Sequence, residues 1–339
     1  MNEMTTVEKR KLKPVLVGKW WLIGPPPPAS DQIPVRSTVA AEGKPGFEPV
    51  DHNIFRAEDG TYHLWGCIRK IGYGRILYHW SAKRLTESPW KLTGEFIRCD
   101  RSAGECIDDW SGQEWMQSPY FVKENARYYM FYGGHSIGRD KSGIPVSGML
   151  GYPGVFKSEG QICLMTSEDG LNWKRHLHND GFSRVFWGPG EARDPCVIKV
   201  DDLYYMYYAG YEDGDQYNKG GVFLRTSKDL INWSAYSLVL RDPTFGTKSW
   251  DHECPFVAYR EGYFYLFRTV NYSTAETYVY RSENPRFFGT NAESAQSLFV
   301  CRFDVAAAEI YQFDGKEYVS SNHNPSLGTQ ISEMEWEPV

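Results

Sequence analysis

A short sequence unit recurs along this chain and constrains its fold more than any other feature. In Asp194-Pro195-Cys196-Val197-Ile198 an acid and a proline head a short apolar strand, and an acidic turn then leads to a second, aromatic strand. Proline cannot donate to a sheet ladder, so it marks the start of the strand. Nine residues separate the proline from the first aromatic residue of the second strand in three copies: Pro119 to Tyr128, Pro195 to Tyr204 and Pro255 to Phe264.

Two looser copies extend the repeat towards both ends of the chain. Counting nine residues back from Tyr62 gives Asn53, so residues 51–55 begin a copy of the unit that lacks the proline. Residues 308–320 form the last copy. Five strand-rich repeats of roughly 40–70 residues are typical of the blades of a β-propeller. We therefore predict an all-β, five-bladed β-propeller over residues 47–339. Residues 1–46, which include a run of four prolines, are predicted to form an arm packed across the propeller.

Composition and charge argue against several other classes of protein. The chain of 339 residues has a formal net charge of −6 and no run rich in Lys or Arg, so nucleic acid is not an expected partner. No stretch approaches the ~20 apolar residues of a membrane span, and the N-terminus lacks the apolar core of a signal peptide. The chain as written is expected in the cytoplasm, or in the periplasm or outside the cell if a leader has been removed. The sequence does not set an oligomeric state.

The cysteines and the aromatic residues bear on cofactors and ligands. The seven cysteines include no CxxC pair, which favours free thiols over a metal site. No cofactor is expected to be required, and a structural calcium or other cation in the central channel is kept as an alternative. Aromatic residues make up 16% of the chain, which suits both the packing of blades and stacking on sugars.

Acidic residues stand at the heads of three of the predicted inner strands. The first strand of each propeller blade lines the central channel, so these residues should meet at one mouth of that channel. Asp51, Asp194 and Glu253 occupy these positions, whereas blade two carries Gln117 and Ser118. Crowded carboxylates push one another's pKa values apart. A site can thereby hold an ionised base and a protonated acid at the same pH.

Two tripeptides carry a resemblance to a known group of enzymes. Arg193-Asp194-Pro195 and Glu253-Cys254-Pro255 resemble the RDP and ECP signatures of the five-bladed propeller glycoside hydrolases, the related families 32, 43, 62, 68 and 117. The resemblance covers the propeller and implies a role for each acid. Glu253 would be the general acid and Asp51 the base or nucleophile, while Asp194 would orient and tune the acid or stabilise the transition state. Arg193 would contact substrate hydroxyls or hold Asp194.

Blade one departs from the family pattern, in which the acid directly precedes the proline-like anchor. Here Asp51 stands two residues before Asn53, and His52 fills the expected place. The chain also lacks the nucleophile block of family 32, because residues 115–119 echo that block without an acid and in blade two. The resemblance therefore favours an inverting enzyme similar to families 43 or 117 over a retaining fructosidase.

Further residues are candidates for contact with substrate. This set contains Arg193, His52, His252, Trp250, His323, Gln117 and Trp187. Most have a structural alternative, because a histidine is more often a satisfied buried imidazole and a tryptophan more often packs in a core. His323 is retained because several relatives place a channel histidine or a metal-bound water in blade five.

The resemblance thus implies an inverting glycoside hydrolase that cleaves a terminal or internal bond of a plant or algal oligo- or polysaccharide. Two alternatives stay open. A propeller glycoside phosphorylase would need a basic cluster beside the acids to hold phosphate, and the sequence shows Arg193 but no second Arg or Lys at the mouth of another blade. A non-catalytic carbohydrate-binding propeller would not need a tuned pair of acids. The loop sequences do not indicate which sugar or which linkage is recognised.

Overall fold

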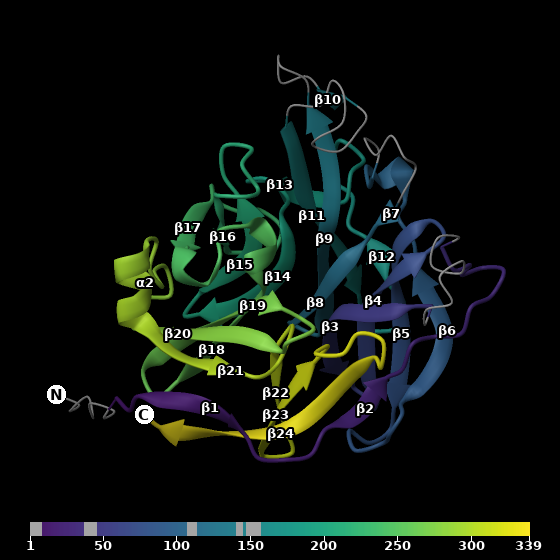
Figure 1. Ribbon diagram of the computed structural model, residues 1–339. Coiled ribbons are helices and arrows are strands. Elements are labelled where there is room, and N and C mark those ends of the chain that lie inside the picture. Colours follow the sequence, from purple (N-terminus) through teal and green to yellow (C-terminus); the bar gives the residue numbers. More distant parts are fainter. Residues whose placement is uncertain (1–8, 37–45, 107–113, 140–144, 147–156) are drawn as a thin grey trace.

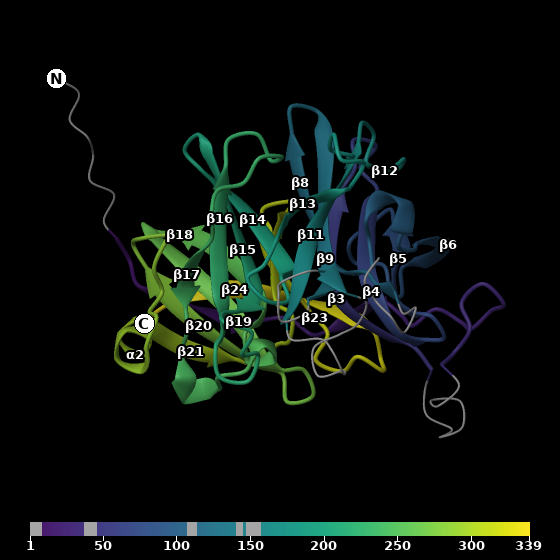
Figure 2. The same cartoon turned by 90° about the horizontal axis from the view of Figure 1, so that it is seen from above.

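Five β-sheets surround a central axis (Figure 1). The computed structural model describes residues 9–36, 46–106, 114–139, 145–146 and 157–339. Figure 2, turned by 90°, shows the sheets standing side by side around that axis. Among the described residues no helix is long and apolar enough to cross a membrane. The prediction of an all-β, five-bladed β-propeller is confirmed.

Each blade begins with the strand nearest the axis. Blade one contains β3 (Glu48–Arg56), β4 (Tyr62–Ile71), β5 (Gly74–Ala82), β6 (Lys91–Ile97) and β7 (Glu114–Trp115). Blade two contains β8 (Gln117–Glu124), β9 (Arg127–Arg139), β10 (Pro145–Val146), β11 (Lys157–Ser167), β12 (Lys174–Arg175) and β13 (Arg184–Trp187). Blade three contains β14 (Arg193–Val200), β15 (Leu203–Tyr211), β16 (Gly220–Ser227) and β17 (Ser237–Leu240).

The last two blades are built in the same order. Blade four contains β18 (Glu253–Arg260), β19 (Tyr263–Asn271), β20 (Glu276–Ser282) and β21 (Phe299–Phe303), with helix α2 (Ala292–Leu298) before β21. Blade five contains β22 (Glu309–Phe313), β23 (Lys316–Ser321) and β24 (Thr329–Pro338), joined by β1 (Leu12–Leu16) and β2 (Trp21–Gly24). Three single 3-10 turns are η1 (Arg101–Ala103), η2 (Pro243–Phe245) and η3 (Ser249–Asp251).

The aromatic second strands are explained by packing on both faces of a blade. Successive side chains of a strand point to opposite faces. In β15, Tyr205 and Tyr207 pack into the cluster shared with blade four, whereas Tyr204, Met206 and Tyr208 pack into the cluster shared with blade two. Both faces therefore need large apolar side chains, and tyrosine supplies a large buried area with a polar tip.

The N-terminal strands complete the last blade. The whole of β1 pairs antiparallel with β24, from Leu12 opposite Pro338 to Leu16 opposite Met334, and β2 pairs with the first part of β24. Ile23 on β2 is fully buried in the cluster that also holds Leu64 of blade one. The segment 1–46, expected as an arm across the propeller, thus places two strands in blade five and a side chain against blade one.

A left-handed residue stands at the head of every inner strand. The φ angles are 43° at Asp51, 55° at Ser118, 58° at Asp194, 47° at Cys254 and 52° at Ala307. A non-glycine residue in this region costs about 1–3 kcal/mol and is common where a side chain must be aimed at a site. In the first four blades the pairing of the inner strand shifts register across this residue. Such bulges turn a side chain out of the regular pleat.

This alignment corrects the sequence interpretation of blade one. Asp51 is the left-handed residue, so His52 takes the position that Pro195 takes in blade three, and Asn53 is not the anchor. The nine-residue spacing does not apply to blade one, because the turn after its inner strand is one residue longer. Arg56 pairs with Tyr62, six residues later in the chain, whereas Lys199 of blade three pairs with Tyr204, five residues later. Asp51 and Asp194 are therefore equivalent in the fold.

Because β2 helps to close the ring, removing its buried side chain should lower the stability of the protein. Changing Ile23→Ala should lower the free energy of unfolding by about 2–5 kcal/mol, because it deletes a fully buried side chain at the junction of blades five and one. Urea denaturation monitored by tryptophan fluorescence measures this change. Val17→Ala is the control, since Val17 is 49% exposed and should change stability by no more than about 0.5 kcal/mol. Equal effects of the two variants would contradict the role given to β2.

Candidate active site

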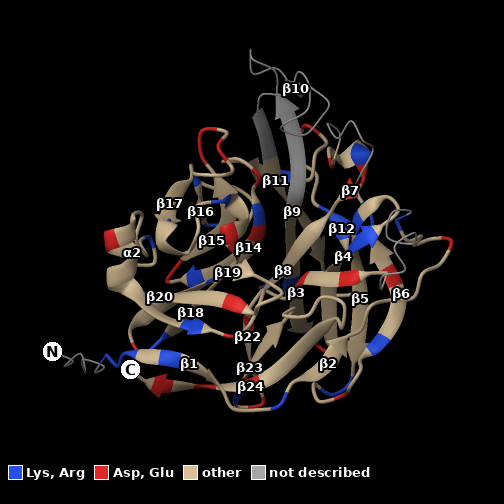
Figure 3. Cartoon of the chain, viewed as in Figure 1, with Lys and Arg blue, Asp and Glu red and all other residues tan. Residues whose placement is uncertain are grey.

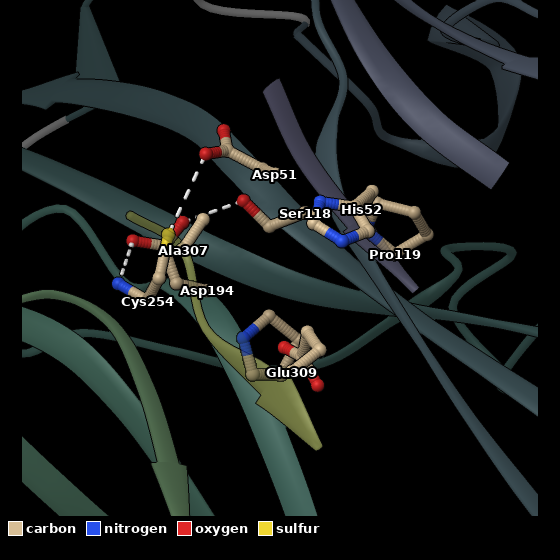
Figure 4. Close-up of a pocket in the computed structure, with 9 residues that line it drawn as sticks. Asp51, His52, Ser118, Pro119, Asp194, Cys254, Ala307 and Glu309 are labelled. Atoms are coloured by element: carbon tan, nitrogen blue, oxygen red, sulfur yellow. Dashed lines mark hydrogen bonds between the residues drawn. The ribbon is translucent and has the colours of Figure 1, made fainter. Parts of the chain in front are cut away.

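The five strand heads converge on a small cavity at one mouth of the central channel (Figure 4). The cavity measures about 10 Å³ and is lined by Asp51, His52, Ser118, Pro119, Asp194, Pro195, Cys254, Ala307 and Glu309. All five left-handed residues at the strand heads belong to this lining. The bulges therefore bring polar side chains from different blades together at one point.

Asp194 is the most enclosed of the three acids at the channel mouth. Its carboxylate accepts a hydrogen bond from the Ser118 hydroxyl at 2.5 Å and another from the backbone N–H of Cys254 at 2.9 Å. The Asp194 residue is 5% exposed. Burial raises the pKa of Asp194 and the negative charge of Asp51 raises it further, while the Arg193 guanidinium acts in the opposite direction.

Asp51 is held by groups that come from blade four. The Tyr272 hydroxyl donates to Asp51 Oδ1, and the Cys254 thiol lies 3.5 Å from the same oxygen. Tyr272 directly follows β19, so it reaches from blade four to the acid of blade one. Sequence reasoning missed Tyr272, because only the closed ring brings it to Asp51.

Glu253 stands one residue before the left-handed Cys254 and keeps contact with solvent. Its side chain is 26% exposed, and Oε1 accepts a hydrogen bond from Arg193 Nη2 at 3.1 Å. Burial raises the pKa of Glu253 to about 7, the Arg193 charge opposes this rise, and the negative charges of Asp194 and Asp51 support it. The carboxyl can thus hold a proton near neutral pH and is open to a ligand at the mouth.

Arg193 links the acids of blades three and four. Its guanidinium lies 2.7 Å from Glu191 Oε2, 3.1 Å from Glu253 Oε1 and 3.7 Å from Asp194 Oδ2, and its side chain is 7% exposed. A planar guanidinium can serve several carboxylates at once. Of the two roles considered from the sequence, holding the acids fits this geometry better than contact with substrate hydroxyls.

His52 borders the cavity, but its ring nitrogens bond to blade five. Nδ1 lies 2.5 Å from Asn322 Oδ1 and Nε2 lies 2.5 Å from Ser320 Oγ. Asn322 donates through its amide nitrogen to Pro49 O and Thr329 Oγ1, which leaves its oxygen to accept from Nδ1. Burial lowers the pKa of His52 to about 4. This neutral imidazole ties blade one to blade five, so the structure does not support its assignment as a substrate ligand.

The other two candidate histidines lie away from the cavity lining. His252 precedes Glu253, is fully buried and has Nδ1 3.1 Å from the carbonyl oxygen of Lys248. His323 has Nδ1 3.0 Å from Ser321 Oγ and packs against the Trp20 ring with centroids 4.9 Å apart. Neither histidine lines the cavity, so their assignment as substrate ligands stays a prediction.

The remaining candidates divide between the channel mouth and its surroundings. Gln117 is 2% exposed and directly precedes the left-handed Ser118, so it occupies in blade two the position of Glu253 in blade four. Trp250 lies on η3, is 36% exposed and is three residues from Glu253. Trp187 is 37% exposed at the end of β13, where Arg184 lies over its ring at 4.2 Å. The structure thus groups Asp51, Asp194, Glu253 and Arg193, with Gln117 beside them.

Two further polar residues escaped the sequence reasoning. Glu309 lines the cavity from blade five, accepts a hydrogen bond from Asn53 Nδ2 at 3.0 Å and has its pKa raised by burial. Arg75 stands at the start of β5, the mouth end of the third strand of blade one, and its positive charge acts to lower the pKa of Glu253. A second arginine therefore does stand at the mouth of another blade, contrary to the expectation from the sequence.

The donor atoms at the cavity are a poor match for calcium. One atom each from Asp51, Asp194 and Cys254 lies within 4.8 Å of the others. Calcium takes six to eight oxygen ligands. Burial raises the pKa of the Cys254 thiol and the two aspartates raise it further, so this third donor is a neutral sulfur. A structural cation elsewhere in the channel stays a prediction.

Charged residues elsewhere are dispersed. Figure 3 shows Lys and Arg spread over the blades with Asp and Glu between them. In the described part of the chain the most crowded charges are those of the site itself, where Arg193 meets three carboxylates.

Sequence comparisons point to enzymes that act on sugars. No protein-family profile matches the chain. A 1,2-β-oligomannan phosphorylase of Thermoanaerobacter sp. (strain X514) is 29% identical over 140 residues, 38% of this chain and 41% of that protein. A β-1,2-mannobiose phosphorylase of the same organism is 31% identical over 91 residues, 26% of this chain and 29% of that protein. The matched region thus spans less than half of either phosphorylase.

Solved structures share the fold over most of the chain. An exo-1,5-α-L-arabinanase from a bovine ruminal metagenomic library has a TM-score of 0.57 at 17% identity, covering 84% of this chain and 92% of that one. A family-43 β-xylosidase/α-arabinofuranosidase from a compost metagenome, in complex with xylotriose, has a TM-score of 0.54 at 13% identity, covering 95% and 98%. A Bombyx mori family-32 β-fructofuranosidase has a TM-score of 0.56 at 17% identity, covering 96% and 65%. The resemblance to propellers of families 43 and 32 is confirmed at the level of fold.

The surroundings of Glu253 predict an unusual titration. The Glu253 carboxyl should titrate near pH 7 in ¹³C NMR of protein labelled at glutamate carboxyls, with the signal assigned by its loss in Glu253→Gln. Asp194→Asn removes a negative charge that raises the Glu253 pKa, so the midpoint should move to lower pH. Asp314→Asn is the control, because Asp314 has a side chain 72% exposed in an ion pair with Arg56. A Glu253 midpoint near its ordinary 4.5, or one unmoved by Asp194→Asn, would contradict this description of the site.

Proposed function

We propose that this chain, which has the five-bladed propeller fold shared by glycoside hydrolases of families 43 and 32, is an inverting glycoside hydrolase. The observation that carries the proposal is the state of Glu253 beside two further acids. Its carboxyl is accessible at the channel mouth, its pKa is raised to about 7 mainly by burial, and Arg193 fixes one of its oxygens. An acid of this kind can protonate a leaving group near neutral pH.

The proposed reaction exchanges one bond and moves two protons. Glu253 gives its proton to the glycosidic oxygen while the bond between that oxygen and the anomeric carbon breaks. Asp51 takes a proton from a water whose oxygen bonds to the same carbon from the opposite face. The negative charges of Asp194 and Asp51 help Glu253 to keep its proton until it is needed. Solvent then returns a proton to Glu253 and removes the one on Asp51.

The position of the two working acids in the ring supports inversion. Asp51 heads the inner strand of blade one and Glu253 heads that of blade four, and these blades are not neighbours in a ring of five. Inverting enzymes need about 6.5–9.5 Å between their carboxyls to admit a water, whereas retaining enzymes need about 5–5.5 Å. We expect carboxyls that reach the channel from two non-neighbouring blades to have the wider spacing.

The substrate class is proposed from resemblance and from the neighbours in fold. Several of these neighbours are named for arabinan or xyloside substrates, and two hold xylotriose. We therefore take plant or algal oligo- or polysaccharides as the substrate class.

A glycoside phosphorylase is the second candidate, and two observations favour it. Both curated relatives are phosphorylases. Arg193 and Arg75 bring positive charge to Glu253 from two blades, which is the kind of basic cluster that a phosphate nucleophile needs. A phosphorylase would release a sugar 1-phosphate and stop without inorganic phosphate, and Arg75→Met should then raise its KM for phosphate. A hydrolase releases free sugar at a rate independent of phosphate.

Glu253→Gln provides the test of the proposed function. Removing the acid should lower kcat on oligosaccharides by about 10²–10⁴-fold. A 2,4-dinitrophenyl glycoside should lose far less activity, because its leaving group needs little protonation. In the wild type kcat/KM should fall as pH rises above about 7, because Glu253 loses its proton there, and Glu253→Gln should lack this alkaline limb.

Glu168→Gln is the matched control, since Glu168 has a side chain 79% exposed in an ion pair with Arg127. Wild-type activity in Glu253→Gln on oligosaccharides would remove Glu253 from the mechanism. Saccharide binding without turnover by any donor, in the presence or absence of phosphate, would establish a non-catalytic propeller instead.

A further inference from the structure

Two exposed aromatic residues lie together at the mouth end of the propeller. Strands alternate in direction within a blade, so the β15–β16 connection and the segment before β18 lie at the same end as the strand heads. Tyr217 lies on that connection and Trp250 on η3, and they are 56% and 36% exposed. Their rings meet edge to face with centroids 5.4 Å apart. We call this pair the aromatic shelf.

The shelf is held firmly in place. The backbone N–H of Ser249 donates to Gln216 O at 2.8 Å, Thr247 Oγ1 donates to Tyr217 O at 2.7 Å, and Gly220 N donates to Thr247 O at 2.9 Å. A Cβ at Gly220 would lie 2.3 Å from the carbonyl oxygen of Lys248, so the two segments pack backbone against backbone. Exposed rings on such a fixed support lose little freedom when a ligand covers them.

The shelf is also tied to the proposed general acid. Trp250 is three residues before Glu253, which keeps their Cα atoms within about 11 Å. Glu253 protonates the leaving oxygen, so the sugar beyond that oxygen must lie on the side of Glu253. Exposed rings suit the apolar face of a sugar, and Trp and Tyr combine a large apolar area with a polar edge.

We propose that Tyr217 and Trp250 form the subsite that binds the leaving-group sugar ring, on the far side of the cleaved bond. This inference rests on the proposed function, because it uses Glu253 as the proton donor. Its ligand is a ring of an oligosaccharide whose bond is cleaved at the channel mouth. The shelf then selects for oligosaccharides over glycosides with a small leaving group.

The test compares two substrates that share the sugar that is cleaved off. One is an oligosaccharide turned over by the wild type, and the other is the glycosyl fluoride of the same sugar and anomeric configuration, whose leaving group carries no ring. Tyr217→Ala and Trp250→Ala should each lower kcat/KM for the oligosaccharide about tenfold more than for the fluoride. Trp250→Phe should restore most of the difference, because it keeps a ring on the shelf.

The control is Tyr259→Ala, which removes a ring that is 55% exposed at the opposite end of the propeller on β18. It should leave the ratio of the two substrates unchanged. Thermal unfolding of each variant reports whether the propeller has stayed folded. A ratio unchanged by both shelf variants, or equal losses on the two substrates, would overturn the proposal and leave the pair a packing contact.

A binding measurement separates failure of the shelf from failure of the proposed function. If the wild type turns over no oligosaccharide and no glycosyl fluoride, the proposed function fails, and titration calorimetry with xylotriose, arabinotriose and β-1,2-mannotriose then tests the shelf alone. Weaker binding in Tyr217→Ala and Trp250→Ala than in Tyr259→Ala would support it. Equal binding in all the variants, or no binding to the wild type, would overturn it.

Discussion

The site depends on one backbone hydrogen bond, from the N–H of Cys254 to Asp194 Oδ2 at 2.9 Å. Cys254 lies in the bulge of its strand, where the pairing passes from Glu253 directly to Phe256. A bulged residue has no partner in the ladder for its N–H, and a buried N–H needs a partner. Asp194 supplies that partner from the neighbouring blade. The left-handed conformation thus places the Asp194 carboxylate at the channel mouth, and the bulge at Cys254 frees the N–H that donates to it.

The electrostatics of the site follow from the crowding of charged side chains at the channel mouth. Arg193 contacts the three carboxylates of Glu191, Asp194 and Glu253, while Asp51 lies close enough to raise the pKa of both Asp194 and Glu253. Burial in the ring removes much of the water that would otherwise screen these charges. Glu253 retains the greatest access to solvent of the three acids at the mouth, so it is the one that can exchange a proton with a ligand.

The fold could be predicted from the sequence because its cause is local and repeated. A proline or acid at a strand head, followed by an aromatic strand, indicates a blade that is packed on both faces. This pattern identifies Asp194 and Glu253. The pattern misplaced the anchor of blade one, because a turn longer by one residue changes the spacing without changing the blade. Tyr272 and Arg75 lie outside this pattern, and Glu309, although it heads the inner strand of blade five, lies in one of the looser copies of the repeat. Their roles arise where blades distant in sequence meet in the ring.

The most direct test is a crystal structure of Glu253→Gln with an uncleaved oligosaccharide. The glycosidic oxygen should lie within hydrogen-bond distance, about 2.6–3.2 Å, of the side chain at position 253. Asp51 should face the anomeric carbon from the opposite side, with room for one water between them. A saccharide bound away from the strand heads, or Asp51 on the same side of the sugar as position 253, would contradict it.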